Sequence, residues 1–160
     1  MTADSEMYDD RPPVGAGSLE LRTWIRLLAC AKVGEKRLRR IFEEQYDTTL
    51  PRFDVMAALY RAPEGLRMSA LSRALLVSNG NVTSIVRQLQ AQGLLESVTD
   101  PHDARSAIVS LTKAGRTRFV ILAEAHHRWI TETFGDFPPE RMESLLDLLT
   151  EFRTLLSRDS

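Results

Sequence analysis

Several residue types are scarce in this chain, and each scarcity excludes a class of protein. Cys30 is the only cysteine among 160 residues, so no disulfide can form within one chain, and we expect a cytoplasmic protein. Eight glycines and seven prolines are too few for a collagen or a linker. The longest stretch without a charge, residues 74–86, has 13 residues and includes serine, threonine and asparagine. It is too short and too polar to span a membrane, so no membrane partner is expected.

An excess of charge of one sign is also missing, because 21 Lys and Arg offset 22 Asp and Glu. The local distribution is nevertheless uneven. Residues 67–118 carry seven basic and three acidic side chains, whereas residues 1–18 and 119–160 are both acidic. Attraction to nucleic acid depends on local rather than total charge, so the middle of the chain favours an anionic partner.

The side-chain groupings that support catalysis are absent from the sequence. Three histidines and one thiol provide no serine or cysteine triad and no spacing of metal ligands, and no glycine-rich phosphate loop occurs. The adjacent His126 and His127 would point about 100° apart on a helix, which does not suit a shared metal. We therefore expect no enzyme activity, no cofactor and no metal.

Apolar residues recur every three or four positions over most of the chain, which predicts helices. The predicted helices are residues 19–46, 51–60, 68–75 and 79–92, then one from the cap Thr112 to Phe134 and one that Pro139 opens. Two short strands are expected at 94–98 and 107–111, joined by an eight-residue loop. The predicted fold class is mainly α with one small β-hairpin.

The chain is expected to divide into three regions. Residues 1–18 combine acidic residues with prolines and glycines, which predicts a flexible acidic arm. The long apolar stripes of residues 19–49 and 119–160 flank a middle region, residues 50–118, that is too small to bury both. We expect the helices from both termini to pack together in one lobe and to form a homodimer.

One helix of the middle region has the character of a DNA-recognition helix. Its apolar residues fix one face, and no acidic residue occurs from Asn79 through Gln92. Small hydrogen-bonding side chains and an arginine can address base edges in a major groove, and a helix N-terminus attracts phosphate. The candidate DNA contacts are Ser78, Asn79, Gly80, Asn81, Thr83, Ser84, Arg87 and Gln88.

Three segments of the middle region combine into a more specific pattern. They are LSRALLVSNGNVT at 71–83, QGLLE at 92–96, and DARS at 103–106 followed by V-x-L-T-x-x-G at 109–115. Together they resemble the winged helix-turn-helix of the MarR family of bacterial transcription regulators, over about residues 19–156. The resemblance implies a winged helix-turn-helix lobe at residues 50–118 and a helical dimerisation lobe formed by both termini. It also implies a homodimer on a pseudo-palindromic operator in double-stranded DNA, usually a repressor that a small molecule releases.

The hairpin is expected to form a wing that contacts DNA. Arg105 at its tip can enter a narrow minor groove, and Asp103 can hold the guanidinium by a bidentate pair. Ser106 completes the candidate wing contacts. Ser97 and Ala104 stand where many members of the family carry a basic residue, so few phosphate contacts and a shallow salt dependence are expected.

The effector is expected to be aromatic and anionic. The segments LPRFDVMAAL at 50–59 and VSNGNVT at 77–83 are similar to a subgroup of MarR regulators that control hydroxycinnamate or benzoate catabolism. Several members of that subgroup sense the aromatic acyl-CoA thioester. Basic residues of the first helix would then meet the nucleotide phosphates, and aromatic side chains would line the acyl end. The candidate ligand residues are Arg22, Trp24, Arg26, Lys36, Arg40, His126 and Trp129.

Two alternatives stay open from the sequence. Cys30 could be the thiol of a redox-sensing regulator, although its apolar neighbours favour a packed, unreactive thiol. A dimeric winged-helix adaptor would instead use the arm or the polar helix for protein contacts. Replacing Arg87 and Arg105 by alanine separates the two classes, because a regulator would lose DNA binding and an adaptor would keep its partner.

Overall fold

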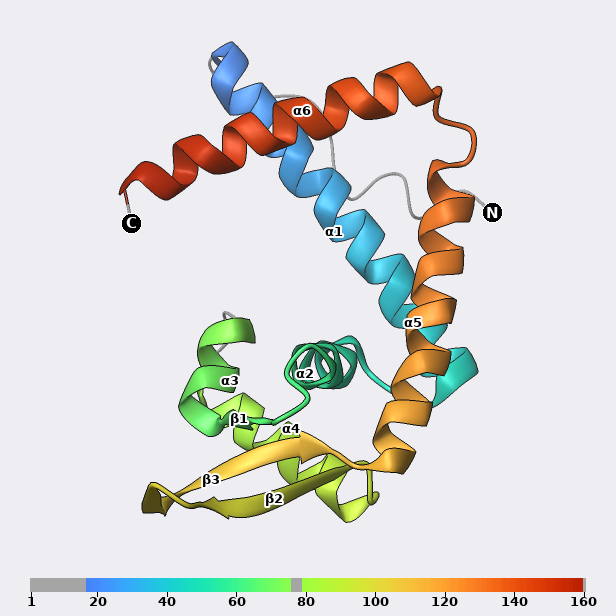
Figure 1. Ribbon diagram of the computed structural model, residues 1–160. Coiled ribbons are helices and arrows are strands. Elements are labelled where there is room, and N and C mark those ends of the chain that lie inside the picture. The colour runs from blue at the N-terminus through green and yellow to red at the C-terminus, as the bar shows by residue number, and fades with distance from the viewer. Residues whose placement is uncertain (1–16, 76–78, 160) are drawn as a thin grey trace. The chain divides into compact units, whose positions relative to one another are not determined.

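The computed structural model describes residues 17–75 and 79–159 as helices and one small sheet (Figure 1). In chain order the elements are α1 (Leu19–Tyr46), α2 (Leu50–Tyr60), β1 (Leu66–Arg67), α3 (Met68–Leu75), α4 (Asn79–Ala91), β2 (Leu95–Asp100), β3 (Asp103–Leu111), α5 (Lys113–Phe134), α6 (Pro139–Leu156) and a 3-10 turn (Ser157–Asp159). The mainly α fold and its helices are confirmed, whereas residues 1–16 of the predicted arm lie outside the described residues.

The chain separates into two compact units, with the boundary between Val120 and Ile121. The first unit contains α1 to β3 and the start of α5, and the second contains the rest of α5 and all of α6. The predicted grouping of both termini into one dimerisation lobe stays a prediction.

The ends of α1 are set by local chemistry. The hydroxyl of Ser18 accepts a hydrogen bond from the backbone N–H of Leu21 at 3.4 Å, which satisfies a donor that the first turn leaves free. At the other end Asp47 has a left-handed backbone with φ of 45°, a conformation that aspartate adopts more readily than most residues. Pro51 then lies in the first turn of α2, where its missing N–H removes no helical hydrogen bond.

An aromatic cluster joins three helices in the core of the first unit. The ring centroids of Phe42 in α1 and Phe53 in α2 are 5.1 Å apart, and Phe53 stacks on Phe119 of α5 at 5.6 Å. Tyr60 closes the cluster, 4.6 Å from Phe119. Because α2 buries most of one side in this core, it is a fixed element against which α3 and α4 pack.

Three antiparallel strands form the sheet, with β3 between β1 and β2 (Figure 1). The expected eight-residue loop is wrong, since β2 continues to Asp100 and β3 begins at Asp103, which leaves a two-residue turn. Thr99 pairs with Ala107 across the hairpin. The polar residues at 99–106 are common in turns, but the backbone ladder, which any residue except proline can join, extends the strands through them.

The strand β1 was not predicted, because two residues cannot show an alternating pattern. Leu66 pairs with Val109 on β3. Gly65, directly before the strand, has φ of +84°, and a Cβ there would lie 2.6 Å from the carbonyl oxygen of Val109. Since α3 starts at Met68, immediately after Arg67, the sheet and the helix-turn-helix are joined without a loop.

The start of α5 is closed by the predicted cap Thr112. Its hydroxyl accepts a hydrogen bond from the backbone N–H of Gly115 at 3.0 Å and donates one to the carbonyl of Gly93 at 2.7 Å. A Cβ on Gly115 would lie 2.0 Å from the carbonyl oxygen of Leu94. The T-x-x-G spacing therefore fixes the first turn of α5 against the chain between α4 and β2.

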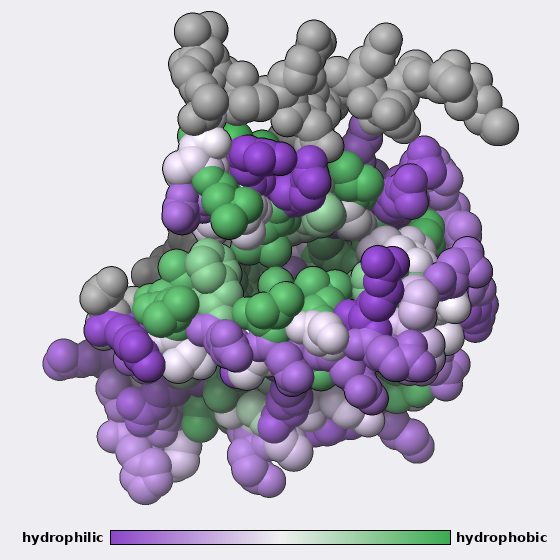
Figure 2. All heavy atoms as spheres, turned by 90° about the horizontal axis from the view of Figure 1, so that it is seen from above, coloured by the Kyte–Doolittle hydropathy of each residue, from purple (hydrophilic) through white to green (hydrophobic). Residues whose placement is uncertain are grey.

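The last helix, α6, buries none of its residues. Figure 2 looks onto the molecule from above and shows hydrophobic side chains at the surface. The exposed apolar residues of α6 are Leu145, Leu146, Leu148, Leu149, Leu155 and Leu156. A contiguous apolar stripe of this kind marks an interaction surface.

Among residues 17–75 and 79–159, no helix is long and apolar enough to cross a membrane. The same part of the chain has no group of three or more side chains that could hold a metal ion.

Candidate nucleic-acid interface

Helix α4 presents the polar face that the sequence predicted. Val82, Ile85, Val86 and Leu89 are buried, and the side chains between them point outward. The exposed candidate contacts are Asn81, Thr83, Ser84, Arg87 and Gln88. Asn79 and Gly80 form the first turn of α4, whereas Ser78 lies outside the described residues.

Helix α2 supports this face through a side-chain contact that the sequence analysis missed. Nη2 of Arg52 donates a hydrogen bond to Oε1 of Gln88 at 2.7 Å. The two residues are 36 positions apart, so no local pattern could have indicated the pair. The contact ties a candidate base-reading side chain to the most buried helix of the first unit.

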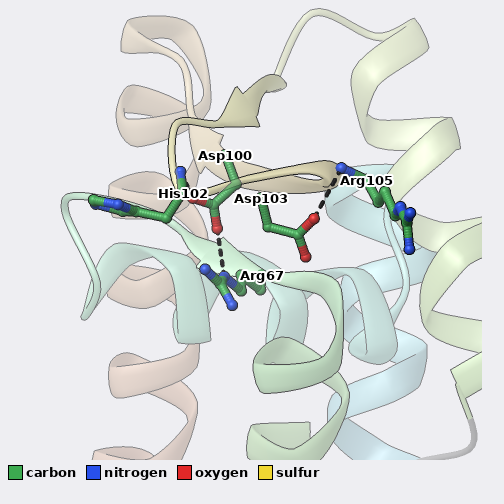
Figure 3. Close-up of polar contacts among 5 residues, drawn as sticks. All are labelled: Arg67, Asp100, His102, Asp103 and Arg105. Carbon is green, nitrogen blue, oxygen red and sulfur yellow. Dashed lines mark hydrogen bonds and ion pairs between the residues drawn. The ribbon is translucent and has the colours of Figure 1, made fainter.

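The wing is anchored at its tip by a buried carboxylate, Asp100, which was not among the predicted site residues. Oδ2 of Asp100 lies 2.5 Å from Nε of Arg67 on β1, and Oδ1 accepts a hydrogen bond from the backbone N–H of His102 at 2.8 Å. Figure 3 shows Asp100 pointing toward Arg67. Apart from this ion pair, Oδ2 has no hydrogen-bond partner among the described residues. Asp100 is only 3% exposed, so the pair locks the turn.

Two opposing effects act on the carboxyl group of Asp100. The backbone N–H of His102 lowers its pKa, and burial acts in the opposite direction by disfavouring the charged form. The guanidinium of Arg67 adds to the lowering, and the net pKa of Asp100 is below its ordinary value of 3.8. The wing anchor is therefore ionised at neutral pH.

Asp103 orients Arg105 differently from the predicted bidentate pair. Oδ1 of Asp103 accepts a hydrogen bond from the backbone N–H of Arg105 at 3.0 Å, while the guanidinium of Arg105 points away from Asp103 (Figure 3). The carboxylate thus shapes the backbone, which leaves the exposed guanidinium available to an anionic partner. Ser106 follows on β3 and is half-buried.

Ser97 joins the wing to helix α4. Its hydroxyl accepts a hydrogen bond from Nε2 of Gln90 on α4 at 3.1 Å. The position at which the sequence resemblance led us to look for a basic residue is therefore used here for an internal contact. The expectation of few phosphate contacts from the wing stays a prediction.

Four of the predicted ligand residues share one face of α1. At about 100° per residue, Arg22, Arg26, Lys36 and Arg40 fall within about a quarter of the helix circumference, whereas Trp24 projects from the opposite side. All five are exposed. The helix brings the four bases together and does not bring Trp24 to them.

The remaining ligand candidates lie on α5 in the second unit. His126 and Trp129 are half-buried and three residues apart, so they are neighbours on one helical surface. Cys30 on α1 was expected in an apolar environment but is exposed, which corrects the expectation of a packed thiol.

A cavity of about 160 Å³ lies among α1, α2, α3 and α4 of the first unit. Its lining consists of Glu35, Leu50, Pro51, Asp54, Val55, Leu75, Asn81 and Ile85. The charged side chains of this lining are both acidic, and none of the predicted ligand residues contributes to it. The cavity therefore does not match the anionic aromatic ligand that the sequence predicted.

Comparison with known proteins agrees with the helix-turn-helix and the wing described above. A family model described as the MarR family matches residues 46–106. The chain is 31% identical over 140 residues to the transcriptional activatory protein BadR of Rhodopseudomonas palustris, an alignment that covers 86% of this chain and 79% of BadR.

Two solved structures have the same fold. A MarR family regulator from Streptomyces coelicolor, in complex with DNA, matches 91% of each chain with a TM-score of 0.75 and 20% identity. The organohalide-sensing regulator RdhR, in its 2,4-dichlorophenol-bound form, matches 87% of this chain and 82% of its own with a TM-score of 0.75 and 17% identity. With the helix-turn-helix, the wing and the identity to BadR together, the chain belongs to the MarR family of winged-helix DNA-binding transcription regulators.

Proposed function

We propose that the protein is a homodimeric repressor of an operon for aromatic-compound catabolism, released from its operator by an aromatic acid or the acyl-CoA thioester of that acid. The observation that carries the DNA-binding part is the exposed, acid-free face of α4 beside a wing whose Arg105 guanidinium points outward. Polar side chains on a helix suit a major groove, and an arginine at a hairpin tip suits a narrow minor groove. The DNA complex of the Streptomyces coelicolor relative supports the same use of the fold.

The exposed leucines of α6 support a homodimer. A two-fold axis would present two recognition helices to one side of the duplex. Their half-sites would then be about one helical turn, roughly 10 base pairs, apart. The operator would be pseudo-palindromic for the same reason.

The proposed effector is supported by the basic face of α1 and by the ligand of one structural relative. Arg22, Arg26, Lys36 and Arg40 give α1 one basic face, which suits the phosphates of a CoA thioester. RdhR is described in a form bound to 2,4-dichlorophenol, an aromatic ligand. The residues His126 and Trp129 would line the acyl end.

The test is fluorescence anisotropy with labelled DNA from upstream of the protein's own gene, at two salt concentrations. We expect saturable binding that weakens with salt and is relieved by p-coumaroyl-CoA or benzoyl-CoA. Binding that ignores both thioesters would discard the effector and keep the DNA-binding regulator. The absence of saturable binding at either salt concentration would favour the adaptor.

Two variants identify the contacts. Arg105→Ala and Arg87→Ala should each weaken operator binding, and each lost phosphate contact should reduce the slope of log affinity against log salt by about 0.9. Both variants should stay dimeric. Unchanged affinity in both would contradict the assigned interface. A reporter fused to the operator then shows the sign of regulation, since BadR is named as an activatory protein.

A further inference from the structure

The contact between Arg52 and Gln88 constrains what the recognition helix can read. Gln88 is exposed on α4, one position after Arg87, on the face assigned to DNA. Its amide oxygen accepts a hydrogen bond from Nη2 of Arg52 at 2.7 Å. Hydrogen bonds from a charged donor are shorter and stronger than those between neutral groups, so the amide has a preferred orientation.

Arg52 is itself well placed to impose that orientation. It belongs to the first turn of α2 and is half-buried. Its neighbour Phe53 is buried in the aromatic cluster, so the backbone that carries Arg52 is fixed. A glutamine side chain alone has three rotatable bonds and would lose rotamer entropy on binding. Fixing it before DNA arrives removes part of that cost.

The covalent geometry of the amide decides which group is left for DNA. In a planar carboxamide the oxygen and the NH₂ group point in different directions. When the oxygen faces Arg52, one of its two lone pairs is engaged, and the NH₂ group faces away from Arg52 as the part of the amide that can donate to a base. A bidentate contact with adenine needs both the oxygen and the NH₂ group on the same base edge.

We propose that Arg52 is a positioning residue that presents the NH₂ group of Gln88 to the operator, so that Gln88 reads its base chiefly as a donor. The chemistry it selects is a base-edge acceptor in the major groove: O6 and N7 of guanine, or O4 of thymine. Cytosine presents a donor at this edge and is disfavoured, whereas adenine keeps one bond at N7 and loses the second bond of the bidentate pair. The inference deepens the proposed function and rests on it, because it assigns the base preference of one position in each half-site.

The test is selection of binding sites from randomised duplex DNA by the full-length protein, followed by sequencing. The variants are Arg52→Met, which keeps the side-chain length without donors, Arg52→Lys, which keeps a charged donor, Gln88→Ala and the double variant Arg52→Met/Gln88→Ala. Arg61→Met, at the exposed C-terminal end of the same helix, is the matched control. Thermal unfolding of every variant shows whether the fold is kept.

The wild-type protein should select guanine or thymine at one position of each half-site. Gln88→Ala should lower that preference by roughly five- to tenfold at this position alone. Arg52→Met should change the same position, with adenine rising as the released amide rotates, and the double variant should match Gln88→Ala. Arg52→Lys should restore the wild-type preference, and Arg61→Met should leave it unchanged.

Three results would overturn the inference. If Arg52→Met keeps every base preference and only lowers affinity together with the salt slope, Arg52 contacts phosphate and does not position Gln88. If Gln88→Ala selects the wild-type site, Gln88 reads no base. If the wild-type protein selects no site at all, the proposed DNA-binding function itself fails. The first two results concern the variants only, so failure of the inference can be distinguished from failure of the proposed function.

Discussion

Asp100 at the end of β2 is joined to Arg67 on β1 across the intervening strand β3, with Oδ2 2.5 Å from Nε. The two strands share no backbone hydrogen bonds, since both pair only with β3. The ion pair therefore ties the tip of the wing to the strand that leads into α3. A carboxylate that is 3% exposed therefore holds the wing to the strand that precedes the helix-turn-helix.

Removing the charge of Asp100 should loosen the wing. Asp100→Asn keeps the shape of the side chain and loses the ion pair, so the buried oxygen faces a cation without compensating charge. We expect a lower Tm and hydrogen exchange of the hairpin amides that is about severalfold faster. Asp103→Asn is the control, because Asp103 is exposed and bonds only to the local backbone of Arg105. Equal exchange rates in the two variants would show that the ion pair does not hold the wing.

The same pair gives a pH dependence with a defined sign. The pKa of Asp100 is lowered in the folded protein, so the native state binds this proton less readily than the unfolded chain does. The stabilisation is fully present above the ordinary value of 3.8 and is lost as the pH falls through the lower folded-state value. The difference in Tm between the wild type and Asp100→Asn should be largest at about pH 6 and shrink below that ordinary value. A difference that grows with acidity would contradict this assignment.

Gly115 should tolerate no side chain. A Cβ at this position would lie 2.0 Å from the carbonyl oxygen of Leu94. Gly115→Ala would therefore push the first turn of α5 away from the backbone at Leu94, and it should lower the free energy of unfolding by about 1–3 kcal/mol or more. Gly93→Ala is the comparison, because its Cβ would meet nothing within 4 Å and only its φ of +70° is unfavourable. In denaturant unfolding, Gly115→Ala should therefore have a clearly lower free energy of unfolding than Gly93→Ala. Equal stabilities would mean that the first turn of α5 can shift.

The apolar stripe of α6 should form the interface of the proposed homodimer. Leu149 lies in the stripe and is 41% exposed, so Leu149→Glu would place a charge in an apolar interface and should shift the protein towards monomer. Asp147→Ala changes the other side of the same helix and should leave the dimer intact. Analytical ultracentrifugation at several concentrations measures both. A Leu149→Glu protein that stays as dimeric as the wild type would place the interface elsewhere.

The helices were predictable from the sequence because their boundaries are set locally. Thr112 and Pro139 act within one turn of the helix that each begins. The polar face of α4 was predictable for a similar reason, since burial of one face of a helix fixes which residues point outward. Trp24 shows the limit of composition alone, because its grouping with the bases of α1 ignored the side of the helix from which each projects.

The features that the sequence did not reveal all depend on partners far along the chain. β1 exists because β3 pairs with it, and two residues leave no periodic signal. Asp100 is of a residue type common in turns, yet it is buried, and the backbone N–H of His102 and the guanidinium of Arg67 compensate its charge. The bond from Arg52 to Gln88 joins two helices 36 residues apart. Such contacts become visible only when the chain is folded.

The direct passage from β1 into α3 has a mechanical consequence. Arg67 ends the strand and Met68 begins the helix, so no hinge separates the sheet from the helix-turn-helix. The hydrogen bond between Gln90 and Ser97 is a second connection, between α4 and the wing. We therefore expect α4 and the wing of one protomer to move together as a rigid body. In a dimer, the distance between the two rigid bodies, one in each protomer, would then set the proposed major-groove and minor-groove contacts together.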